Sequence, residues 1–460
     1  MRTTGRYRRP MTSILDTATH LVELARRNGA EQCDVYAVSY DESNVTVRLG
    51  ETEKLIEAGS RSLGLRVING GRTAVSSTSD LSRAALERLA RETVELANIS
   101  APDPFAGLPD PALFTRGGPD GLQLFDESLE GLTTEEKLRM AHACEAAALD
   151  FDPRITNSDG ASLSTRVGHV ALANSSGFAA SYTSTGVSLT AHVMAGDAEG
   201  KKRNAYWYAS ERSLHRLPDP AEIGRIAARR AIDQLGARKV GTRQVPVVFE
   251  PMMAAGLLRD VAIAASGAAL YRKATFLASR TGQQVGSPLV TIVDDPSEPG
   301  RLGSRPFDGE GVTCRATSLF EAGVFNGFLF DVYTARRAGT VTSGSATRSV
   351  ESLPQPGSSN LVFRPGTTSP SEVIAGVEDG FYVTAIMGPG YNPTTGDYSR
   401  GAAGFWIENG RLAFPVTEVN ISGRLPDMLA AIDAVGDDLT WFGSAAAPTV
   451  RVGQMTVSGL

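Results

Sequence analysis

Three Asn-Gly turns constrain the fold of this chain more than any other feature of its sequence. Each turn stands between stretches in which apolar and polar residues alternate, at Asn69-Gly70-Gly71, Asn326-Gly327 and Asn409-Gly410. Such dipeptides accept the positive φ that two-residue hairpins require, and alternation with a period of two is typical of strands with one buried face. The turns therefore predict antiparallel hairpins in both halves of the chain.

Helical spacing of apolar residues separates the predicted strands of the first half. Strands are expected at 34–49 and 62–78, and helices at 13–28, 81–98, about 134–149 and 220–236. In the second half, Pro251 occupies a favoured first-turn position of one helix. Many short strands with turns between them follow, which predicts a closed or strongly curved sheet. The expected fold class is α+β.

The length of the chain predicts two domains. A single hydrophobic core stops growing at about 250–300 residues, and this chain has 460. We expect an N-terminal α+β domain over 11–240 and a β-rich C-terminal domain with a curved or barrel-like sheet over 241–460. Residues 1–10 are basic and precede an amphipathic helix, which predicts a disordered tail, or a true start at Met11.

The composition argues against two kinds of partner. The 45 basic and 51 acidic residues are spread along the chain without a large basic block, so nucleic-acid binding is not expected. No apolar run approaches the roughly 18 residues that span a bilayer, and no signal peptide precedes the first helix. We expect a cytoplasmic protein with reduced, buried thiols at Cys33, Cys144 and Cys314.

The usual catalytic motifs are missing from the sequence. It contains no G-x-S-x-G pentapeptide and no complete phosphate-binding or dinucleotide-binding glycine motif. A catalytic zinc usually needs three His, Cys or carboxylate ligands, yet all five histidines precede residue 216. His169 and His192, on neighbouring strands, are expected to be structural. Solvated element ends are favoured over cation sites at Asp294-Asp295 and Asp437-Asp438.

The segment LLRDVAIA, residues 257–264, places two charges inside a predicted apolar helix. At about 100° per residue, Leu257 and Val261 lie on one face, and Arg259 and Asp260 lie on the other. Because burial of an unpaired charge costs several kcal/mol, both side chains are expected to face water, a partner chain or a counter-ion. The helix taken alone favours an ordinary solvated face.

Six segments carry a resemblance to a known family. They are SLGLRVINGGRTAVSSTSDLS (62–82), LANSSGF (172–178), ARKVGTRQVPVVFEP (237–251), GAALYRKATFL (267–277), LGSRPFDGEGV (302–312) and TTGDYSRGAAGFWIENGRLAFPVTEVNISG (394–423). In this order and approximate spacing, they resemble the TldD/TldE family, whose TldE branch is also called PmbA and modulator of DNA gyrase. The last two segments are the most specific, and they indicate the TldE branch.

The resemblance also implies that the helix at 257–264 has lost its chemistry. In the TldD branch this helix carries His-Glu-x-x-x-His, in which the histidines bind zinc and the glutamate is the general base. The corresponding residues here are Arg259, Asp260 and Ala264. An arginine only donates hydrogen bonds and a methyl group offers no ligand, so no metal, cofactor or catalytic residue is expected in this chain. Asp260 would have no metal-activated water to deprotonate.

By the same resemblance, a TldE-type chain pairs with a zinc-bearing TldD-like subunit, and the heterodimer cleaves unfolded peptides in an enclosed cavity. This chain would be the non-catalytic, metal-free subunit that completes the cavity and helps to hold extended substrate by strand addition. A homodimer is an expected state of the chain alone. The candidate peptide-binding or partner-binding residues are Tyr271, Arg272, Lys273, Thr395, Asp397, Tyr398 and Arg400.

Two other interpretations of the sequence stay open. One is a self-sufficient peptidase with a non-zinc mechanism, for which Ser345 or Ser399 would need a histidine brought close by folding. The other is a homodimeric peptide-binding or regulatory protein without a proteolytic role. Cleavage that begins only when a TldD-like chain is added would separate the three.

Overall fold

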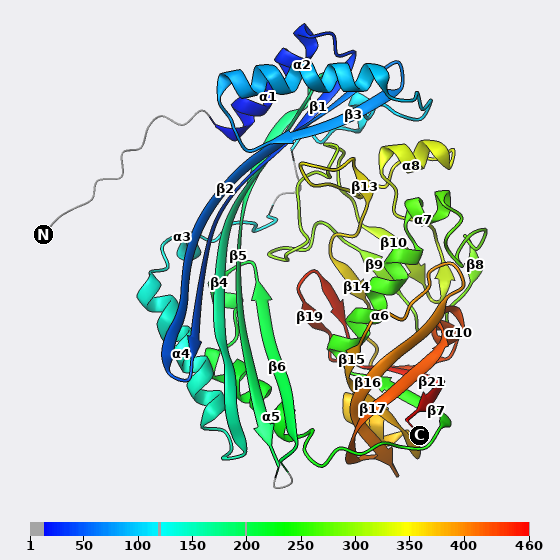
Figure 1. The fold of residues 1–460 in the computed structure, drawn as a ribbon. Coiled ribbons are helices and arrows are strands. Elements are labelled where there is room, and N and C mark those ends of the chain that lie inside the picture. Colours follow the sequence, from blue (N-terminus) through cyan, green and yellow to red (C-terminus); the bar gives the residue numbers. More distant parts are fainter. Residues whose placement is uncertain (1–12, 118–120, 198–199, 460) are drawn as a thin grey trace, which may run out of the picture.

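The first half of the chain forms one long, curled antiparallel sheet. The computed structural model describes residues 13–117, 121–197 and 200–459, so the predicted tail at 1–10 lies outside the described residues. Figure 1 shows the sheet curving along one side of the molecule. Its strand order is β3-β2-β1-β4-β5-β6. The bounds are β1 Gln32–Arg48, β2 Glu51–Asn69, β3 Arg72–Thr78, β4 Ile155–Asn174, β5 Ala179–Gly196 and β6 Lys202–Glu211.

Two pairs of helices cover this sheet, one pair at each end. Helices α1 (Ile14–Arg27) and α2 (Arg83–Ile99) bury one apolar cluster, and α4 (Thr134–Leu149) and α5 (Pro220–Ile232) bury another. The one-turn helix α3 (Glu127–Glu130) packs on β4 and β5, and its Leu129 belongs to the second cluster. All four helices predicted for the first half are therefore present.

Local sequence explains where these helices begin. Ser13 and Thr133 start α1 and α4 with capping boxes, in which each hydroxyl accepts a main-chain N–H and Asp16 or Glu136 returns a hydrogen bond. Helix α5 has Asp219 as its N-cap and a proline in its first turn. These signals satisfy main-chain donors that the first helical turn leaves free.

The second half contains a closed barrel, which confirms the predicted curved sheet. Its strand order is β17-β16-β15-β7-β21, and β17 also pairs with β21. The barrel strands are β7 Arg243–Phe249, β15 Asp379–Met387, β16 Asp397–Glu408, β17 Arg411–Arg424 and β21 Val450–Ser458, with β18 Ile432–Val435 paired to β21. Trp406, Phe381 and Phe249 lie fully buried in its core.

Shorter elements surround the barrel. A second sheet has the order β19-β20-β14-β9-β10-β11-β8, and β12 pairs with β13. Their bounds are β8 Gln283–Gln284, β9 Ile292–Asp294, β10 Thr317–Glu321, β11 Val324–Phe325, β12 Ala346–Thr347, β13 Gln355–Pro356, β14 Leu361–Phe363, β19 Thr440–Phe442 and β20 Ala445–Ala447. The helices are α6 Pro251–Ala264, α7 Gly267–Tyr271, α8 Val332–Arg337, α9 Pro370–Ala375 and α10 Leu425–Ala430.

Two of the three predicted Asn-Gly turns are present, and one is wrong. Gly70 and Gly71 have positive φ between β2 and β3, and Asn409-Gly410 does so between β16 and β17. Asn326-Gly327 does not join two strands. The hairpin of that region turns earlier, at Ala322-Gly323, where both residues have positive φ between β10 and β11. The turn at Ala322-Gly323 thus provides the positive φ at both central residues that a two-residue hairpin requires.

The cysteines have the state that the sequence predicts. Cys33, Cys144 and Cys314 are all buried and free of disulfide bonds. Within the described ranges, no helix is both long enough and apolar enough to cross a membrane.

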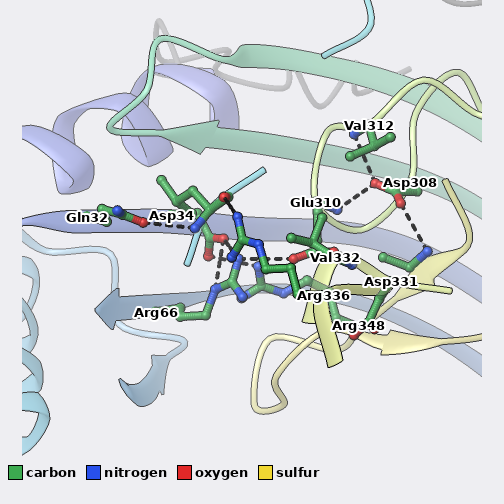
Figure 2. Close-up of polar contacts among 12 residues, drawn as sticks. Gln32, Asp34, Arg66, Asp308, Glu310, Val312, Asp331, Val332, Arg336 and Arg348 are labelled. Carbon is green, nitrogen blue, oxygen red and sulfur yellow. Dashed lines mark hydrogen bonds and ion pairs between the residues drawn. The ribbon is translucent and has the colours of Figure 1, made fainter. Parts of the chain in front are cut away.

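A buried charge cluster joins the long sheet to the second half of the chain. Asp34 on β1 pairs with Arg66 on β2 and also with Arg348, whose Nη1 lies 2.8 Å from Asp34 Oδ1. Figure 2 shows both guanidinium groups meeting this one carboxylate. A Cβ on Gly64 would overlap the carbonyl of Val350, so the backbone of β2 touches the segment that carries Arg348. The two halves are in direct, buried contact here.

Glu310 belongs to the same cluster and has an unusual protonation state. Its Oε1 lies 3.5 Å from Arg66 Nη2, and its Oε2 accepts the first main-chain N–H of α8 at 2.8 Å. Burial raises the pKa of Glu310 from 4.5 to about 8; Arg66 opposes the rise, and Asp308 and Asp331 add to it. Burial alone would raise the pKa of Asp34, but its two arginines hold it below its ordinary value. Glu310 is therefore protonated at neutral pH.

Replacing Glu310 by Gln should flatten the dependence of stability on pH. The unfolded chain releases this proton near the ordinary pKa of 4.5, whereas the native chain keeps it until about pH 8. The contribution of Glu310 to the stability of the native protein is therefore complete below about pH 4.5 and is lost as pH rises to about 8. We expect Glu310→Gln to melt at nearly the wild-type temperature near pH 5 and at a higher temperature near pH 8.

Thermal melts across this pH range measure the effect. Glu321→Gln, which changes an exposed glutamate at the end of β10, is the matched control and should follow the wild-type curve. An equal change in Tm at both ends of the range would contradict a protonated Glu310.

Candidate functional site

Helix α6 carries the residues that the sequence singled out. It begins at Pro251, whose fixed φ suits the first helical turn. Its buried residues, among them Ala255, Leu258 and Val261, pack into the core of the second half. Figure 1 shows α6 between the barrel strands and the long sheet. The remaining side chains of α6 are therefore placed near both halves of the chain.

Asp260 is buried, which corrects the prediction of a solvated face. The residue is 5% exposed, and Arg400 Nη2, from β16, donates to Asp260 Oδ1 at 3.0 Å. A permanent cation thus neutralises the carboxylate inside the protein. The two residues are 140 positions apart in the chain, so the helix pattern alone could not reveal the pair.

Two tyrosines complete a small polar centre around this ion pair. Tyr398 lies with its ring centroid 5.0 Å from the Arg400 guanidinium, and burial raises the pKa of Tyr391 and Tyr398 well above the ordinary value. Burial also raises the pKa of Asp260, while Arg400 opposes it. We call these four residues the Asp260–Arg400 centre.

The Asp260–Arg400 centre has unused hydrogen-bonding capacity. Four of its atoms are buried and have no hydrogen-bond partner within the described part of the chain: Asp260 Oδ2, Arg400 Nε and the phenol oxygens of Tyr391 and Tyr398. Both phenols stay protonated at neutral pH, so they act as donors or neutral acceptors and not as bases. The centre can therefore hold polar groups in place, but it offers no activated nucleophile.

Arg259 and Ala264 are the residues that correspond, by the resemblance, to the two histidines of His-Glu-x-x-x-His. Each has surroundings of its own, apart from the Asp260–Arg400 centre. Arg259 is exposed; its Nη2 donates to the carbonyl of Phe442 at 2.9 Å, and it lies beside Tyr208 of β6. The side chain of Ala264 is fully buried, and its carbonyl accepts the hydroxyl of Thr275 at 2.7 Å. Asp260 is thus the one motif position that takes part in the polar centre.

The structure places the candidate binding residues at 395–400 in two different environments. Thr395 and Asp397 are exposed, and Thr395 Oγ1 donates to Asp397 Oδ2 at 2.5 Å. Tyr398, by contrast, is 1% exposed and packs in the core of the second half, so its ring does not lie on an exposed surface. Arg400 lies with it in the buried centre. Alternation along β16 explains the division, because successive side chains point to opposite faces of a strand.

The other predicted surface segment lies at the end of α7. The ring of Tyr271 packs edge-on against Tyr333 at 6.1 Å between centroids, and the guanidinium of Arg337 stacks over Tyr271 at 4.0 Å. Arg272 and Lys273 follow it and are exposed. The structure therefore places this segment on a surface next to α8, apart from the Asp260–Arg400 centre.

The residue pairs considered as metal ligands are separated or already bonded. His169 and His192 stand opposite other residues in the ladder of β4 and β5, so they do not face each other. Asp294 is buried and accepts the N–H of Ser359 at 2.6 Å, which corrects its prediction as a solvated end. Asp438 accepts two hydrogen bonds from Thr449. In the described ranges, no group of three His, Cys, Asp or Glu residues is arranged to hold a metal ion.

A pocket of about 450 Å³ opens beside the first turn of α6. Residues of α5, β6, α6 and β15 line it, including Met252, Met253 and Met387. The ion pair between Arg230 of α5 and Glu250, at 2.7 Å, lies at its wall. No sequence motif marks this pocket, because its lining comes from six elements spread along the chain, which are β6, α5, α6, β15, β16 and β17. The adjacent methionines after Pro251 are the one local signal.

Three family profiles match the chain in order. Residues 33–97 match PmbA/TldA metallopeptidase domain 1, residues 127–235 match the central domain, and residues 242–459 match the C-terminal domain of the same description. The matched segments include the long sheet, α6 and the barrel.

Relatives with this similarity come from several organisms. The chain is 34% identical to the metalloprotease PmbA homolog of Haemophilus influenzae over 439 residues, which cover 95% of this chain and 94% of that protein. It is 34% identical to metalloprotease PmbA of Escherichia coli O157:H7 over 416 residues, which cover 90% of each. The metalloprotease TldD homolog of Haemophilus influenzae is 25% identical over 443 residues, covering 93% and 90%.

Solved structures share the complete fold. A protein of Bacteroides thetaiotaomicron, named a modulator of DNA gyrase, superposes with a TM-score of 0.90 at 30% identity and covers 98% of this chain and 100% of that one. TldE of Thermococcus kodakarensis shares the fold with a TM-score of 0.86 at 20% identity, covering 96% and 100%.

Removing one member of the Asp260–Arg400 pair should be far more harmful than removing both. Arg400→Met leaves a buried carboxylate without its cation, so we expect a loss of about 3–5 kcal/mol in the free energy of unfolding. The double variant Asp260→Leu/Arg400→Met buries no charge and should lie within about 1 kcal/mol of wild type. Urea unfolding measures both.

Arg225→Met is the matched control, because Arg225 forms an exposed pair with Glu222. Its expected loss is about 0.5 kcal/mol or less. Equal losses in the single and double variants would show that packing, and not charge pairing, stabilises this region.

Proposed function

The chain belongs to the PmbA/TldD metallopeptidase family, and from this premise we propose that it is the non-catalytic, metal-free subunit of a peptidase complex. In that complex a zinc-bearing, TldD-like chain supplies the catalytic residues. This chain completes the cavity that receives an unfolded peptide. The observation that carries the proposal is the ion pair between Asp260 and Arg400 on and beside α6.

A guanidinium at this place supports a structural role for α6. Arg400 neutralises the buried Asp260 carboxylate and keeps its own charge at every physiological pH. It has donors only, so it offers no coordination position to a water molecule and cannot lower the pKa of one as a bound metal does. The position of the helix is thus maintained by a group that performs no hydrolysis.

The residues around α6 do not fit a zinc ion. Zinc takes thiolate, imidazole or carboxylate ligands, and a catalytic site supplies three of them. Arg259 has N–H donors only, Ala264 presents a buried methyl group, and one oxygen of Asp260 already accepts a hydrogen bond from Arg400. We therefore assign no catalytic step to this chain.

The proposal also covers the partner, the substrate and the setting. The partner is a TldD-like subunit, the substrate is an unfolded peptide, and the compartment is the cytoplasm. Alone, the chain forms a homodimer. We propose that its two domains meet near residue 240, and that residues 271–273 and 395–397, which are largely exposed, contact the partner or the peptide.

Peptide cleavage is expected only from the mixed complex. The test measures zinc content and cleavage of an unfolded peptide for this chain alone, for a TldD-like chain of the same source alone, and for their mixture. Because the donor set at α6 does not fit zinc, we expect no stoichiometric zinc and no cleavage from this chain. Cleavage by the mixture should exceed the sum of the two separate chains and should be lost with a chelator.

Each of the other possible outcomes would indicate a different function. Stoichiometric zinc with chelator-sensitive cleavage by the isolated chain would overturn the proposal, as would metal-independent cleavage, which would indicate a self-sufficient peptidase. The absence of cleavage in every mixture would favour a homodimeric peptide-binding or regulatory protein.

A further inference from the structure

One side of strand β15 is uncovered over its last residues. Val383 of β15 stands opposite Phe249, the last residue of β7, and β7 ends there because Pro251 starts α6. On its other side β15 stays paired with β16 as far as Met387. Within the described residues, no strand occupies the former β7 side of β15 beyond Val383. An ordered strand edge is therefore open at 385–387.

The pocket beside α6 lies along this open edge. Its lining includes residues 384–387 of β15 and residues 204–206 of β6 on the facing wall. Strand β6 is the last strand of the long sheet, so its outer edge is also unpaired among the described strands. Tyr206 is 44% exposed, and its ring stacks on His192 at 5.2 Å and near Tyr208 at 6.3 Å. The facing wall is therefore a supported aromatic surface.

The polar groups at the inner end of the pocket are already satisfied. Arg230 makes two hydrogen bonds with Glu250, at 2.7 and 2.9 Å, and a third with the carbonyl of Thr384 at 2.6 Å. The carbonyl of Thr384 is thus occupied, and the main-chain groups that stay available on this side of β15 belong to alternate residues within 385–387, since the others point to β16. The ion pair fixes where an added strand would have to stop.

The methionine side of the pocket favours an apolar side chain of variable shape, whereas Arg229, Asp233 and Gln234 line another part of it. Met252, Met253, Ile386 and Met387 line the pocket, and Met387 is 50% exposed. Methionine side chains are flexible and polarisable, so they adapt to partners of different shape. The volume of about 450 Å³ lies within the range of about 300–1,000 Å³ that is typical of ligand pockets.

We propose that residues 385–387 of β15 bind an extended peptide by strand addition, with one apolar side chain of the peptide inserted among Met252, Met253 and Met387. Main-chain hydrogen bonds supply affinity without regard to sequence, and the methionine pocket adds a preference at one position. The inference rests on the proposed function for the identity of the ligand as an unfolded peptide. It concerns binding by this chain itself, with no contribution from a catalytic partner.

Fluorescence anisotropy with the complete chain tests the inference. The probe is a fluorescein-labelled decapeptide of Gly, Ser and Lys that carries two leucines two residues apart. We expect binding of this peptide, and binding at least about 10-fold weaker when both leucines are replaced by Asp, because a charge would then lie among the methionine side chains. N-methylation of one alternate set of peptide amides should abolish binding, whereas methylation of the other set should be tolerated, because successive amides of a strand point to opposite edges.

Variants of the protein locate the site. Met387→Glu and Met253→Glu should each weaken binding by about 10-fold or more. Leu412→Glu is the matched control, because Leu412 is a similarly exposed apolar residue, 43%, on β17, and it should bind within about 2-fold of wild type. Thermal melts establish that each variant is folded; if one methionine variant does not fold, the other and the methylated peptides still decide the result.

Two outcomes would overturn the inference. Equal tolerance of both methylated peptides would exclude strand addition, and equal binding by the methionine variants and the Leu412 control would exclude this pocket. The proposed function fails separately, through the cleavage measurement with a TldD-like chain. Binding without cleavage in any mixture would support the peptide site and refute the peptidase complex.

Discussion

The pairing of Asp34 with Arg66 and Arg348 is the interaction on which the arrangement of the two halves depends. Asp34 and Arg66 belong to adjacent strands of the long sheet, and Arg348 comes from the second half, with its side chain fully buried. Breaking one partner of such a buried group leaves an uncompensated charge, which costs about 3–5 kcal/mol. The halves therefore cannot separate at this end without exposing or abandoning a charge, and their relative position is defined there.

A second buried ion pair applies the same constraint at α6. Arg230, on α5 of the first half, bonds Glu250, which is also the N-cap residue of α6. Its side chain makes no capping hydrogen bond with its own helix, because Arg230 takes both carboxylate oxygens. The start of α6 is thus fixed by the first half, and the Asp260–Arg400 pair fixes a later turn to β16. Helix α6 is held from both sides.

Much of this fold could be predicted from local sequence, and the failures have specific physical causes. The helices and the turn at Asn409-Gly410 follow from periodicity and positive φ, and the resemblance identified α6. Strand β2 begins at Glu51, well before the predicted start at 62. The prediction missed residues 51–61 because they are exposed on both faces of the strand and so show no alternation of apolar and polar residues. The burial of Asp260 depends on Arg400, 140 residues away. The pocket could not be predicted because it exists where β7 ends, and its walls belong to distant segments.

Fixed halves have a consequence for how a peptide could be selected. If the Asp34 cluster and the Arg230–Glu250 pair both hold, the spacing between β6 and β15 is set before any ligand arrives. Selection then rests on main-chain pairing, because the unpaired edge of β15 presents groups that an extended chain can match and a helix, whose main-chain groups are already bonded, cannot. The same rigidity limits the ordering that binding requires, since the main-chain edge of 385–387 is already extended. A preference for unfolded chains can thus arise from the fold itself, with no closing movement.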